Sequence, residues 1–283
     1  MTNEGALAPG LYLVSVPIGA ARDITLRALD VLRDADVLAA EDTRALLRLM
    51  EIHGIPLRGR RITAYHDANG AKVRPRLLAE LARGRSLAYA SEAGTPLVAD
   101  PGFPLVRAAL AEGHAVTAAP GAVAAIMALT LSGLPSDVFT FAGFLPATAA
   151  ARSAALRRLK DAPGTVIFYE SPRRLGAMLA DAARELGPRE AAVCRELTKR
   201  FEEVRRGGLD DLAAHYVDGA VKGECVVCIA ASASEAPDDD AIRRALSEAL
   251  ETSRLKDAAR EVAERLGVSS RLVYQLGLEM KGD

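Results

Sequence analysis

Short apolar, β-branched runs alternate with segments of helical spacing along the first 119 residues. Strands are expected at 12–16, 37–40, 62–65, 87–90 and 114–118. Between them, apolar residues recur at helical spacing over 24–35, 75–81 and 103–112, and in a stretch that ends near residue 50. This alternation predicts a parallel α/β sheet covered by helices.

The pattern changes after Pro120. A helix of small residues is expected from there to about residue 131, followed by strands at 138–143, 165–169, 191–194 and 224–230. Helices are expected near 149–160, 174–186 and 209–216, and three more within 241–283, after the polar stretch 231–240. The sequence therefore predicts two α/β domains, 1–119 and 120–232, and a small all-α domain, 238–283.

Charge and composition narrow the class of protein. Among the 283 residues, 36 Lys and Arg oppose 37 Asp and Glu, so a polyanionic partner must be held by a local patch. No apolar run approaches the roughly 18 residues of a membrane span, and the N-terminal residues lack the basic region of a signal peptide. These features predict a cytoplasmic protein without a membrane partner.

Cys225 and Cys228 form a C-x-x-C pattern that invites a metal or redox interpretation. They lie in an apolar, β-branched run, where side chains three positions apart point to opposite faces of a strand. Both sulfurs could not then bind one metal, so we expect structural cysteines and no metal site. Cys194 lies in another apolar run and is expected in the core.

A loop of small and stiff residues, 91–102, follows the expected strand at 87–90. In open α/β sheets, ligands bind at the carboxyl ends of strands, where this loop and Pro17–Gly19 both lie. The glycines allow a ligand to approach the backbone, and Pro96 and Pro101 stiffen the loop. No G-x-G-x-x-G or P-loop motif is present. The loop is therefore a candidate site for a compact, partly polar ligand, with a simple tight turn as the alternative.

The last residues resemble a helix-turn-helix. An apolar stripe runs from Leu255 to Leu266, a turn follows at Gly267, and Ser269 is placed to cap the next helix. One hypothesis is therefore a regulator that binds nucleic acid through this tail. The second helix offers Arg271 but also Glu279, so an accessory module for RNA docking or dimer stability is favoured.

A series of short motifs runs in order along nearly the whole chain. Together they resemble the tetrapyrrole-methylase superfamily of S-adenosylmethionine (SAM) enzymes, and more closely its bacterial ribosomal RNA small subunit methyltransferase I family. The motifs are LYLVSVPIG at 11–19, DITLRAL at 23–29, AEDTR at 40–44, YH at 65–66, AGTP at 93–96, DPG at 100–102, PGA at 120–122, SGLP at 132–135, GFLP at 143–146, FYESP at 168–172, RELTK at 195–199, FEE at 201–203 and KGE at 222–224.

Three positions depart from the pattern of this family. Ala20 stands where the family usually has Asn, and Glu92 stands where it usually has Asp. The segment after Tyr65–His66 lacks the usual second His and Glu. The Glu92 change keeps the charge on a longer arm, whereas the Ala20 change removes a hydrogen-bonding side chain near the expected cleft.

The resemblance implies two α/β domains of the tetrapyrrole-methylase type, with SAM folded in the cleft between them. Phe144, Tyr169 and the strand near Val226 would complete the pocket from the second domain. The residues expected to bind the cofactor come from three segments: Pro17, Gly19, Ser91, Glu92, Ala93, Gly94, Thr95, Pro96, Val98, Asp100, Pro120, Gly121, Ala122 and Val123.

The reaction implied is 2′-O-methylation of a cytidine ribose in the decoding centre of 16S ribosomal RNA. A ribose hydroxyl is a poor nucleophile, so a group must accept its proton or stabilise the alkoxide. Glu170 is the first candidate base, with helix capping or an ion pair as its alternative. Lys199, oriented by Glu196, is a candidate alkoxide stabiliser, and His66 is a second candidate base or a structural polar residue.

RNA binding requires positive charge. Residues 151–206 contain 13 Lys or Arg and 8 Asp or Glu, which makes this segment +5 in a nearly neutral chain. The partner implied is 16S rRNA within the small ribosomal subunit, and a homodimer is expected. A small tetrapyrrole-like substrate is the alternative. The candidate RNA-binding residues are Arg44, Arg152, Arg157, Arg158, Arg173, Arg174, Arg195 and Arg200.

Overall fold

A computed structural model describes residues 6–217, 222–232, 239–266 and 268–282. The chain divides into two compact units, with the division between Ala230 and Ala231. The predicted linker residues 233–238, the predicted turn at Gly267 and the N-terminal residues 1–5 lie outside the described residues.

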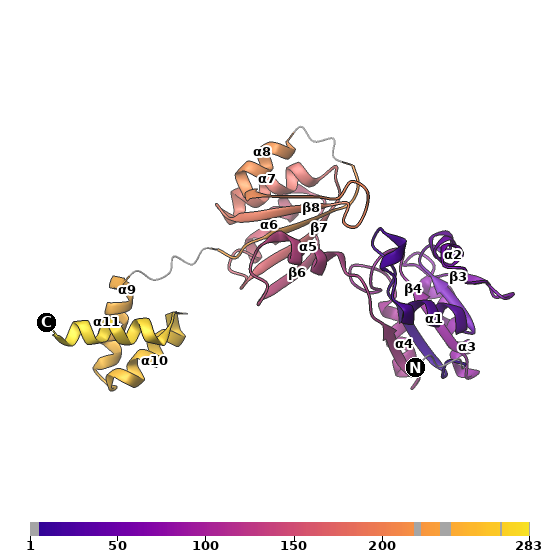
Figure 1. Ribbon diagram of the computed structural model, residues 1–283, viewed down its shortest axis with the longest axis horizontal. Helices are drawn as coiled ribbons and strands as arrows, with labels where there is room; N and C mark the ends of the chain where they lie inside the picture. Colours follow the sequence, from indigo (N-terminus) through magenta and orange to yellow (C-terminus); the bar gives the residue numbers. More distant parts are fainter. Residues whose placement is uncertain (1–5, 218–221, 233–238, 267, 283) are drawn as a thin grey trace. The chain divides into compact units, whose positions relative to one another are not determined.

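The first sheet contains five parallel strands in the order β3-β2-β4-β1-β5, which confirms the predicted parallel α/β sheet (Figure 1). Helices cover both of its faces, with one apolar core on each face. Its strands are β1 (Gly10–Val14), β2 (Val37–Ala40), β3 (Ile62–Ala64), β4 (Ser86–Ala90) and β5 (Val116–Ala119), and its helices are η1 (Ala21–Asp23), α1 (Leu26–Asp34), α2 (Thr43–Ile52), α3 (Gly70–Ala82) and α4 (Phe103–Ala111).

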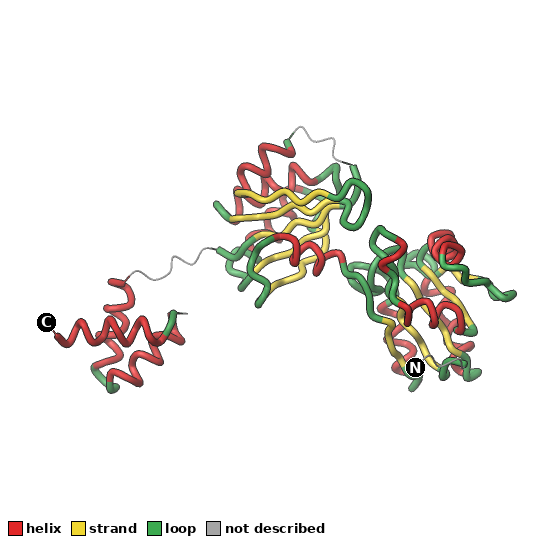
Figure 2. Tube along the Cα trace, viewed as in Figure 1, coloured by secondary structure: helices red, strands yellow, loops and turns green. Residues whose placement is uncertain are grey.

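The strands of the second sheet are drawn in yellow between red helices in Figure 2. The sheet is mixed, in the order β6-β7-β10-β8-β9, and only β6 and β7 are parallel. Three helices pack on one face and α5 on the other. Its strands are β6 (Phe139–Phe144), β7 (Thr165–Glu170), β8 (Glu190–Arg195), β9 (Glu203–Gly208) and β10 (Cys225–Ile229), and its helices are α5 (Ala124–Ser132), α6 (Ala149–Arg158), α7 (Leu175–Leu186) and α8 (Leu209–Tyr216).

Strand β9 was not predicted. Its sequence, EVRRGG, has one apolar residue and two glycines, so it lacks the β-branched pattern of an interior strand. It pairs with β8 along its whole length at the sheet edge, where only one side needs a partner. The basic segment therefore contains a strand, and Arg205 and Arg206 are fixed on it.

The predicted strand at Cys225 and Cys228, with the two side chains on opposite faces, is confirmed, as is the core position of Cys194. Cys225 and Cys228 both lie on β10 and belong to the cores on opposite faces of the sheet. Cys194, on β8, is fully buried. Among the described residues, no group of three or more His, Cys, Asp or Glu side chains is placed to hold a metal ion.

The C-terminal unit contains the three predicted helices, α9 (Asp239–Leu250), α10 (Leu255–Leu266) and α11 (Ser270–Gly282). The predicted stripe of α10 is buried in their shared core. Ser269 caps α11 as expected, because its Oγ accepts a hydrogen bond from the Leu272 amide at 3.2 Å. No helix in the part of the chain that the structure describes is long and apolar enough to cross a membrane.

We keep the domain limits 1–119, 120–232 and 238–283 as a proposal. Strand β5 ends at Ala119, and α5, which follows, packs against the second sheet.

Candidate active site

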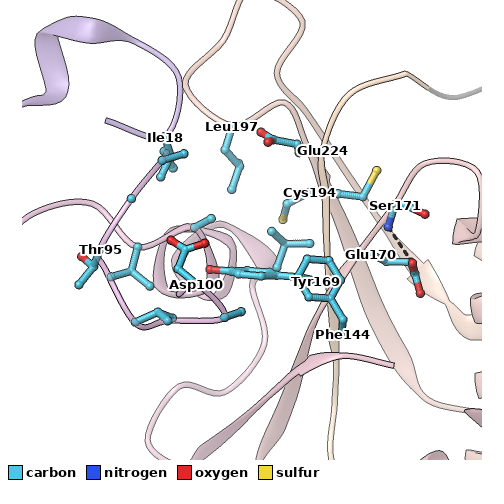
Figure 3. A pocket seen from close by; sticks show the side chains of 18 of the residues that line it. Ile18, Thr95, Asp100, Phe144, Tyr169, Glu170, Ser171, Cys194, Leu197 and Glu224 are labelled. Carbon is cyan, nitrogen blue, oxygen red and sulfur yellow. Dashed lines mark hydrogen bonds between the residues drawn. The ribbon is translucent and has the colours of Figure 1, made fainter. Parts of the chain in front are cut away.

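A cavity of about 340 Å³ lies where the loops of the first sheet meet the strand ends of the second (Figure 3). Loops that follow β1, β4 and β5 form one wall, at the carboxyl ends of parallel strands as expected. The lining residues are Ile18, Ala93, Gly94, Thr95, Val98, Ala99, Asp100, Val123, Ala124, Phe144, Tyr169, Glu170, Ser171, Pro172, Cys194, Leu197, Glu224, Cys225 and Val226.

The loop after β4 is held by its own small residues. Ser91 is buried, and its Oγ donates a hydrogen bond to the Gly94 carbonyl at 3.0 Å. Gly94 has a φ of +71°, which favours glycine, and its carbonyl also accepts from the Val16 amide at 2.9 Å. The loop after β4 is thereby fixed against the loop after β1.

Thr95 joins this loop to the segment after β5. Its Oγ1 donates to the Ala122 carbonyl at 3.1 Å and lies 2.9 Å from the Ser15 Oγ. A Cβ on Gly121 would lie 2.7 Å from the Cβ of Ser15, so this contact requires glycine. The predicted segment at 120–123 therefore lies against the predicted loop, and Val123 reaches the cavity.

Two non-glycine residues of the same loop adopt left-handed backbone conformations, Leu97 at φ +73° and Ala99 at φ +60°. Such positions cost on the order of 1 kcal/mol each and persist where the surroundings impose them. They bring Val98 and Asp100 to the cavity.

Asp100 lies in an electrostatic setting that favours its neutral form. Burial, followed by the charges of Glu41 and Glu92, raises the pKa of Asp100 to about 7. Figure 3 shows the Asp100 carboxylate directed toward the hydroxyl end of Tyr169. Burial raises the pKa of Glu41 as well, with Glu92 adding to the effect, while a hydrogen bond from the Glu92 amide opposes it.

The two departures from the family pattern lie at the margin of the cavity. Glu92 is exposed and is not a lining residue, so its longer arm does not alter the wall. The Ala20 amide donates to the Thr198 Oγ1 at 3.0 Å, a contact that needs only backbone. Neither change therefore closes the cavity.

The predicted residues Pro17, Ser91, Glu92, Pro96, Pro120, Gly121 and Ala122 do not line the cavity. Gly19 does not line it either but fits closely against the segment after β8. A Cβ there would lie 2.6 Å from the Lys199 Cγ and 2.9 Å from the Leu197 carbonyl oxygen. These residues shape the loops behind the wall rather than its surface.

Large side chains form the opposite wall. Tyr169 packs edge-on against Phe141 and Phe144, with ring centroids 4.9 and 5.6 Å apart. Its hydroxyl accepts a hydrogen bond from the Ala125 amide at 3.2 Å, in the first turn of α5. Since first-turn amides have no partner within their helix, this bond fixes α5 to β7.

Sequence reasoning did not single out Ile18, Leu197 or Glu224. Each occurs inside a motif that was recognised, between Pro17 and Gly19, in RELTK and in KGE respectively. Ser171, Pro172 and Cys194 were also missed as lining residues. The motifs identified the segments that reach the cavity, but they did not indicate which side chain of each segment faces it.

Glu170 is 3 % exposed, at the end of β7. Its Oε1 accepts from the Ser171 amide at 2.7 Å, and its Oε2 lies 3.1 Å from the Arg174 Nη2, an ion pair without hydrogen-bond geometry. Figure 3 shows this carboxylate turned away from Asp100. The ion-pair alternative thus describes its observed surroundings, and its role as a base stays a prediction.

Lys199 is held between two carboxylates. Its Nζ donates to Glu224 at 2.7 Å and to Glu196 at 2.9 Å. Burial lowers the pKa of Lys199, but these two hydrogen bonds outweigh it and raise the pKa overall. Lys199 is therefore a fixed cation, with Glu196 as its predicted orienter and Glu224 at the cavity wall.

His66 lies beyond the end of β3 and is not a lining residue. Its backbone carbonyl accepts from the Gly70 amide at 2.8 Å, so the segment begins α3. Nearby, Asp42 caps α2 by accepting from the amides of Arg44 and Ala45. The structure does not bring His66 or Arg44 to the cavity.

Several predicted RNA-binding arginines are committed to ion pairs within the domain. Arg152 is 6 % exposed and makes a buried pair with Asp181, at 2.7 Å from Nε and 2.6 Å from Nη2. Its guanidinium joins α6 to α7 and is not presented to an RNA. Arg174 donates to the Leu145 carbonyl at 2.6 Å in addition to facing Glu170.

Two further arginines are paired but closer to the surface. Arg157 lies 3.0 Å from Glu185, and Arg195 lies 2.9 Å from Glu203. Arg158, Arg173 and Arg200 are exposed, and within the described residues none of them pairs with a carboxylate. Arg200 stacks 5.5 Å above the ring of Phe201, which is itself 63 % exposed. The positive charge available to a partner is therefore smaller than the sequence count.

The family profile described as Tetrapyrrole (Corrin/Porphyrin) Methylases matches residues 10–213, and the profile described as RsmI C-terminal HTH domain matches residues 235–281. The chain is 47 % identical to Ribosomal RNA small subunit methyltransferase I of Mesorhizobium japonicum, over 97 % of this chain and 93 % of that one. It is 44 % identical to the protein of the same name from Micromonospora olivasterospora, over 96 % and 82 %.

Among solved structures, the fold matches uroporphyrin-III C-methyl transferase from Thermus thermophilus complexed with S-adenyl homocysteine. The TM-score is 0.54 at 20 % identity, covering 77 % of this chain and 96 % of that one, which is a likeness of fold. The helical tail is covered by the second profile, which matches residues 235–281. The chain belongs to the tetrapyrrole methylase family and, within it, to the ribosomal RNA small subunit methyltransferase I family.

Proposed function

We propose that this chain is a SAM-dependent methyltransferase that methylates the ribose 2′-hydroxyl of a cytidine in the decoding centre of 16S rRNA. Two observations together support this proposal: the cavity, and relatives over nearly the whole chain that are named as ribosomal RNA small subunit methyltransferases. The helical tail matches a profile defined on the same family.

The cavity suits SAM in size and lining. A volume of about 340 Å³ lies in the range of small-molecule sites, and most of the wall is apolar. Ala93, Gly94, Val98 and Val123 would hold the cofactor, and Thr95 and Glu224 offer polar contacts near it. Bound SAM supplies an electrophilic methyl group on a sulfonium, so the protein must chiefly align donor and acceptor.

We propose that Asp100 accepts the proton of the ribose hydroxyl. Among the carboxyl groups that line the cavity, Glu170 faces Arg174 and Glu224 faces Lys199, whereas no residue that the structure describes makes a hydrogen bond or ion pair with the Asp100 carboxylate. Its pKa of about 7 suits a base that works near neutral pH. Lys199, which donates to Glu224 at the cavity wall, is the proposed cation that stabilises negative charge on the hydroxyl oxygen.

An exposed ring at the cavity, Phe144, and a second exposed ring, Phe201, support a nucleotide substrate. Phe144 lines the cavity and is 58 % exposed, and Phe201 carries Arg200 over its ring. Unpaired RNA bases are commonly held by stacking on such side chains and on arginine. We propose that these rings, with Arg158 and Arg173, receive the RNA around the target cytidine.

The cellular location, the form of the RNA substrate and the oligomeric state are also part of this proposal. We propose that the protein acts in the cytoplasm on the small ribosomal subunit and that it is a homodimer. Exposed apolar side chains at the edge strand β6, Val138 at 51 % and Phe139 at 41 %, are consistent with a partner subunit there. Light scattering on the full-length protein would give the oligomeric state.

The test is methyl transfer from labelled SAM to small subunits taken from cells that lack this enzyme, with the product located by nuclease digestion and mass spectrometry. We expect one methylated cytidine ribose. The rate should rise with pH through about 7, because Asp100 must be ionised to accept a proton. Asp100→Asn should lower the rate on the order of 100-fold or more and remove this rise.

Glu170→Gln is the matched variant, since it removes the other predicted base. A loss in Glu170→Gln with a normal rate in Asp100→Asn would assign the proton to Glu170. SAM binding without methylation of any form of the subunit would instead favour a small-molecule substrate.

A further inference from the structure

A second cavity, of about 440 Å³, lies at the opposite end of the first sheet from the candidate active site. It is bounded by the amino ends of β2 and β3, the turn before β3, and α3. A four-residue strand such as β2 is only about 13 Å long, so the two sites are separated by one strand length along the sheet. Its side chains play no part in the proposed reaction.

Five arginines and two acids line this cavity, which gives it a net charge of +3 in a chain of net charge −1. Both acids are already engaged. Asp36 accepts from the amide and hydroxyl of Ser86, each at 2.8 Å. Glu80 pairs with Arg83 at 2.7 Å and with Arg85 at 2.8 Å.

One arginine is structural. Arg60 donates to the carbonyls of Leu32 and Ala35 at the end of α1, at 3.0 and 2.6 Å, and to Leu57 at 2.9 Å. It therefore supports the wall of the cavity and keeps the turn before β3 in place. Burial, followed by the charge of Arg58, lowers the pKa of Arg60, which reflects the positive field there.

The remaining three, Arg58, Arg61 and Arg76, are exposed. Within the described ranges, none of them makes a hydrogen bond or ion pair with another residue. Three unpaired guanidinium groups around one concavity are costly in self-repulsion unless an anion neutralises them. Guanidinium forks match phosphate oxygens in geometry and charge.

We propose that this arginine cavity, defined by Arg58, Arg61 and Arg76, binds backbone phosphates of the ribosomal RNA as a second docking point remote from the methyl-transfer site. This inference rests on the proposed function. The committed arginines of the 151–206 segment leave few free cations near the active site, so contacts elsewhere would supply much of the affinity. Such contacts position an RNA without selecting its sequence.

The experiment compares two full-length double variants of equal charge. Arg61→Ala with Arg76→Ala removes two side chains of the cavity. Arg48→Ala with Arg107→Ala removes two arginines from α2 and α4, outside both cavities. Binding to purified small subunits that lack the methyl group is measured at several salt concentrations, together with SAM affinity and thermal unfolding.

We expect the first pair to weaken binding about tenfold near 0.1 M salt and to lower the slope of log affinity against log salt by about 1.5, because roughly 0.7–0.9 is lost per phosphate contact. SAM affinity and unfolding should stay unchanged, as should all properties of the control pair. Arg61→Lys with Arg76→Lys should keep most of the slope while losing affinity, since lysine retains the charge but not the fork.

Equal affinity and slope in the two alanine pairs would overturn the inference. The inference would also be overturned if inorganic pyrophosphate stabilised the wild type against thermal unfolding but not the cavity variant, while both proteins bound RNA equally. The ligand of the cavity would then be a small phosphate compound. The proposed function is tested separately by methyl transfer. If the wild type bound subunits through these arginines but did not methylate them, the methyltransferase proposal would be wrong and the docking proposal would stand.

Discussion

The two walls of the candidate active site are built in different ways. The wall from the first sheet consists of loops in which glycine, alanine and backbone atoms approach one another closely, as at Gly19, Gly94 and Gly121. The wall from the second sheet consists of large side chains that project from strand ends, with Tyr169 and Phe144 at its centre. The first wall depends on residues with small or no side chains. The second depends on large side chains that are held in place by the helices packed on the other face of the sheet.

This difference predicts where each wall is vulnerable. A small addition should disrupt the first wall, because the glycines in its loops are in close contact with backbone carbonyls and with side-chain atoms near the backbone. The second wall should tolerate changes at its surface better than changes in the helix layer that holds β7 in place. Four variants test this contrast.

Gly19→Val should have the largest effect. Its side chain would meet the Lys199 side chain and the Leu197 carbonyl within 3 Å, so the loops would have to separate. Overpacking of this kind costs about 2–3 kcal/mol, which corresponds to a fall in SAM affinity of about 100-fold by titration calorimetry. Gly207→Ala is the control, because a Cβ there has nothing within 4 Å. Equal SAM affinity in the two variants would show that the first wall is adaptable.

Arg152→Ala tests the layer behind the second wall. It removes one partner of the buried Asp181, which keeps only Arg184, at 2.6 Å. We expect a loss of about 3 kcal/mol in the free energy of unfolding, measured by urea titration. The neighbouring Arg158→Ala removes an exposed arginine and should change stability by less than about 0.5 kcal/mol. A small loss in Arg152→Ala would mean that α6 and α7 are held mainly by their apolar core.

Asp100→Asn should stabilise the protein while it impairs the reaction. The pKa of Asp100 is raised from 3.8 to about 7, so the native state holds a proton that the unfolded chain releases. Its contribution to stability is fully present below pH 4 and is lost as pH rises to about 7. We therefore expect the variant to match the wild type near pH 4 and to be about 1–2 kcal/mol more stable at pH 8, after allowance for solvent screening. Equal stability at both pH values would contradict the burial of this charge.

Tyr169→Phe should have the smallest effect. It keeps the ring stack with Phe141 and Phe144 but leaves the Ala125 amide without its acceptor. The loss of one such hydrogen bond costs about 1 kcal/mol, so SAM affinity should fall about fivefold. Tyr12→Phe is the control, since its hydroxyl bonds to the Ala8 carbonyl at an exposed position. A change as large as that of Gly19→Val would mean that α5 is held to the second sheet by this bond alone.

The same contrast explains what the sequence could predict. Loop 91–102 was evident because glycine permits backbone conformations that other residues rarely adopt and proline restricts them, and the parallel first sheet followed from regular alternation. The strand at Glu203–Gly208 was missed because an edge strand needs no apolar alternation. The order of the mixed second sheet also could not be deduced, since pairing between distant strands leaves no local pattern.

The side chains behaved least predictably. Arg152 appeared in the sequence as one of many candidate RNA contacts, but its surroundings are set by Asp181, which is 29 residues away. Asp100 was expected near the cofactor, but its raised pKa arises from burial, from Glu41 after β2, and from Glu92 in its own loop. Position in a motif indicates which segment reaches a site, whereas pairing and burial are set by residues distant in the sequence.

The placement of the cysteines on β8 and β10 makes the native thiols unreactive. Burial raises the pKa of Cys194 and Cys225 to about 11 and that of Cys228 to about 12, so almost no thiolate is present at neutral pH. A single cysteine introduced on the surface, for example at Arg48, could therefore carry a fluorophore selectively with all three native cysteines retained. Conversely, the rate of modification of Cys228, which is fully buried and does not line the cavity, would report how often the second sheet opens.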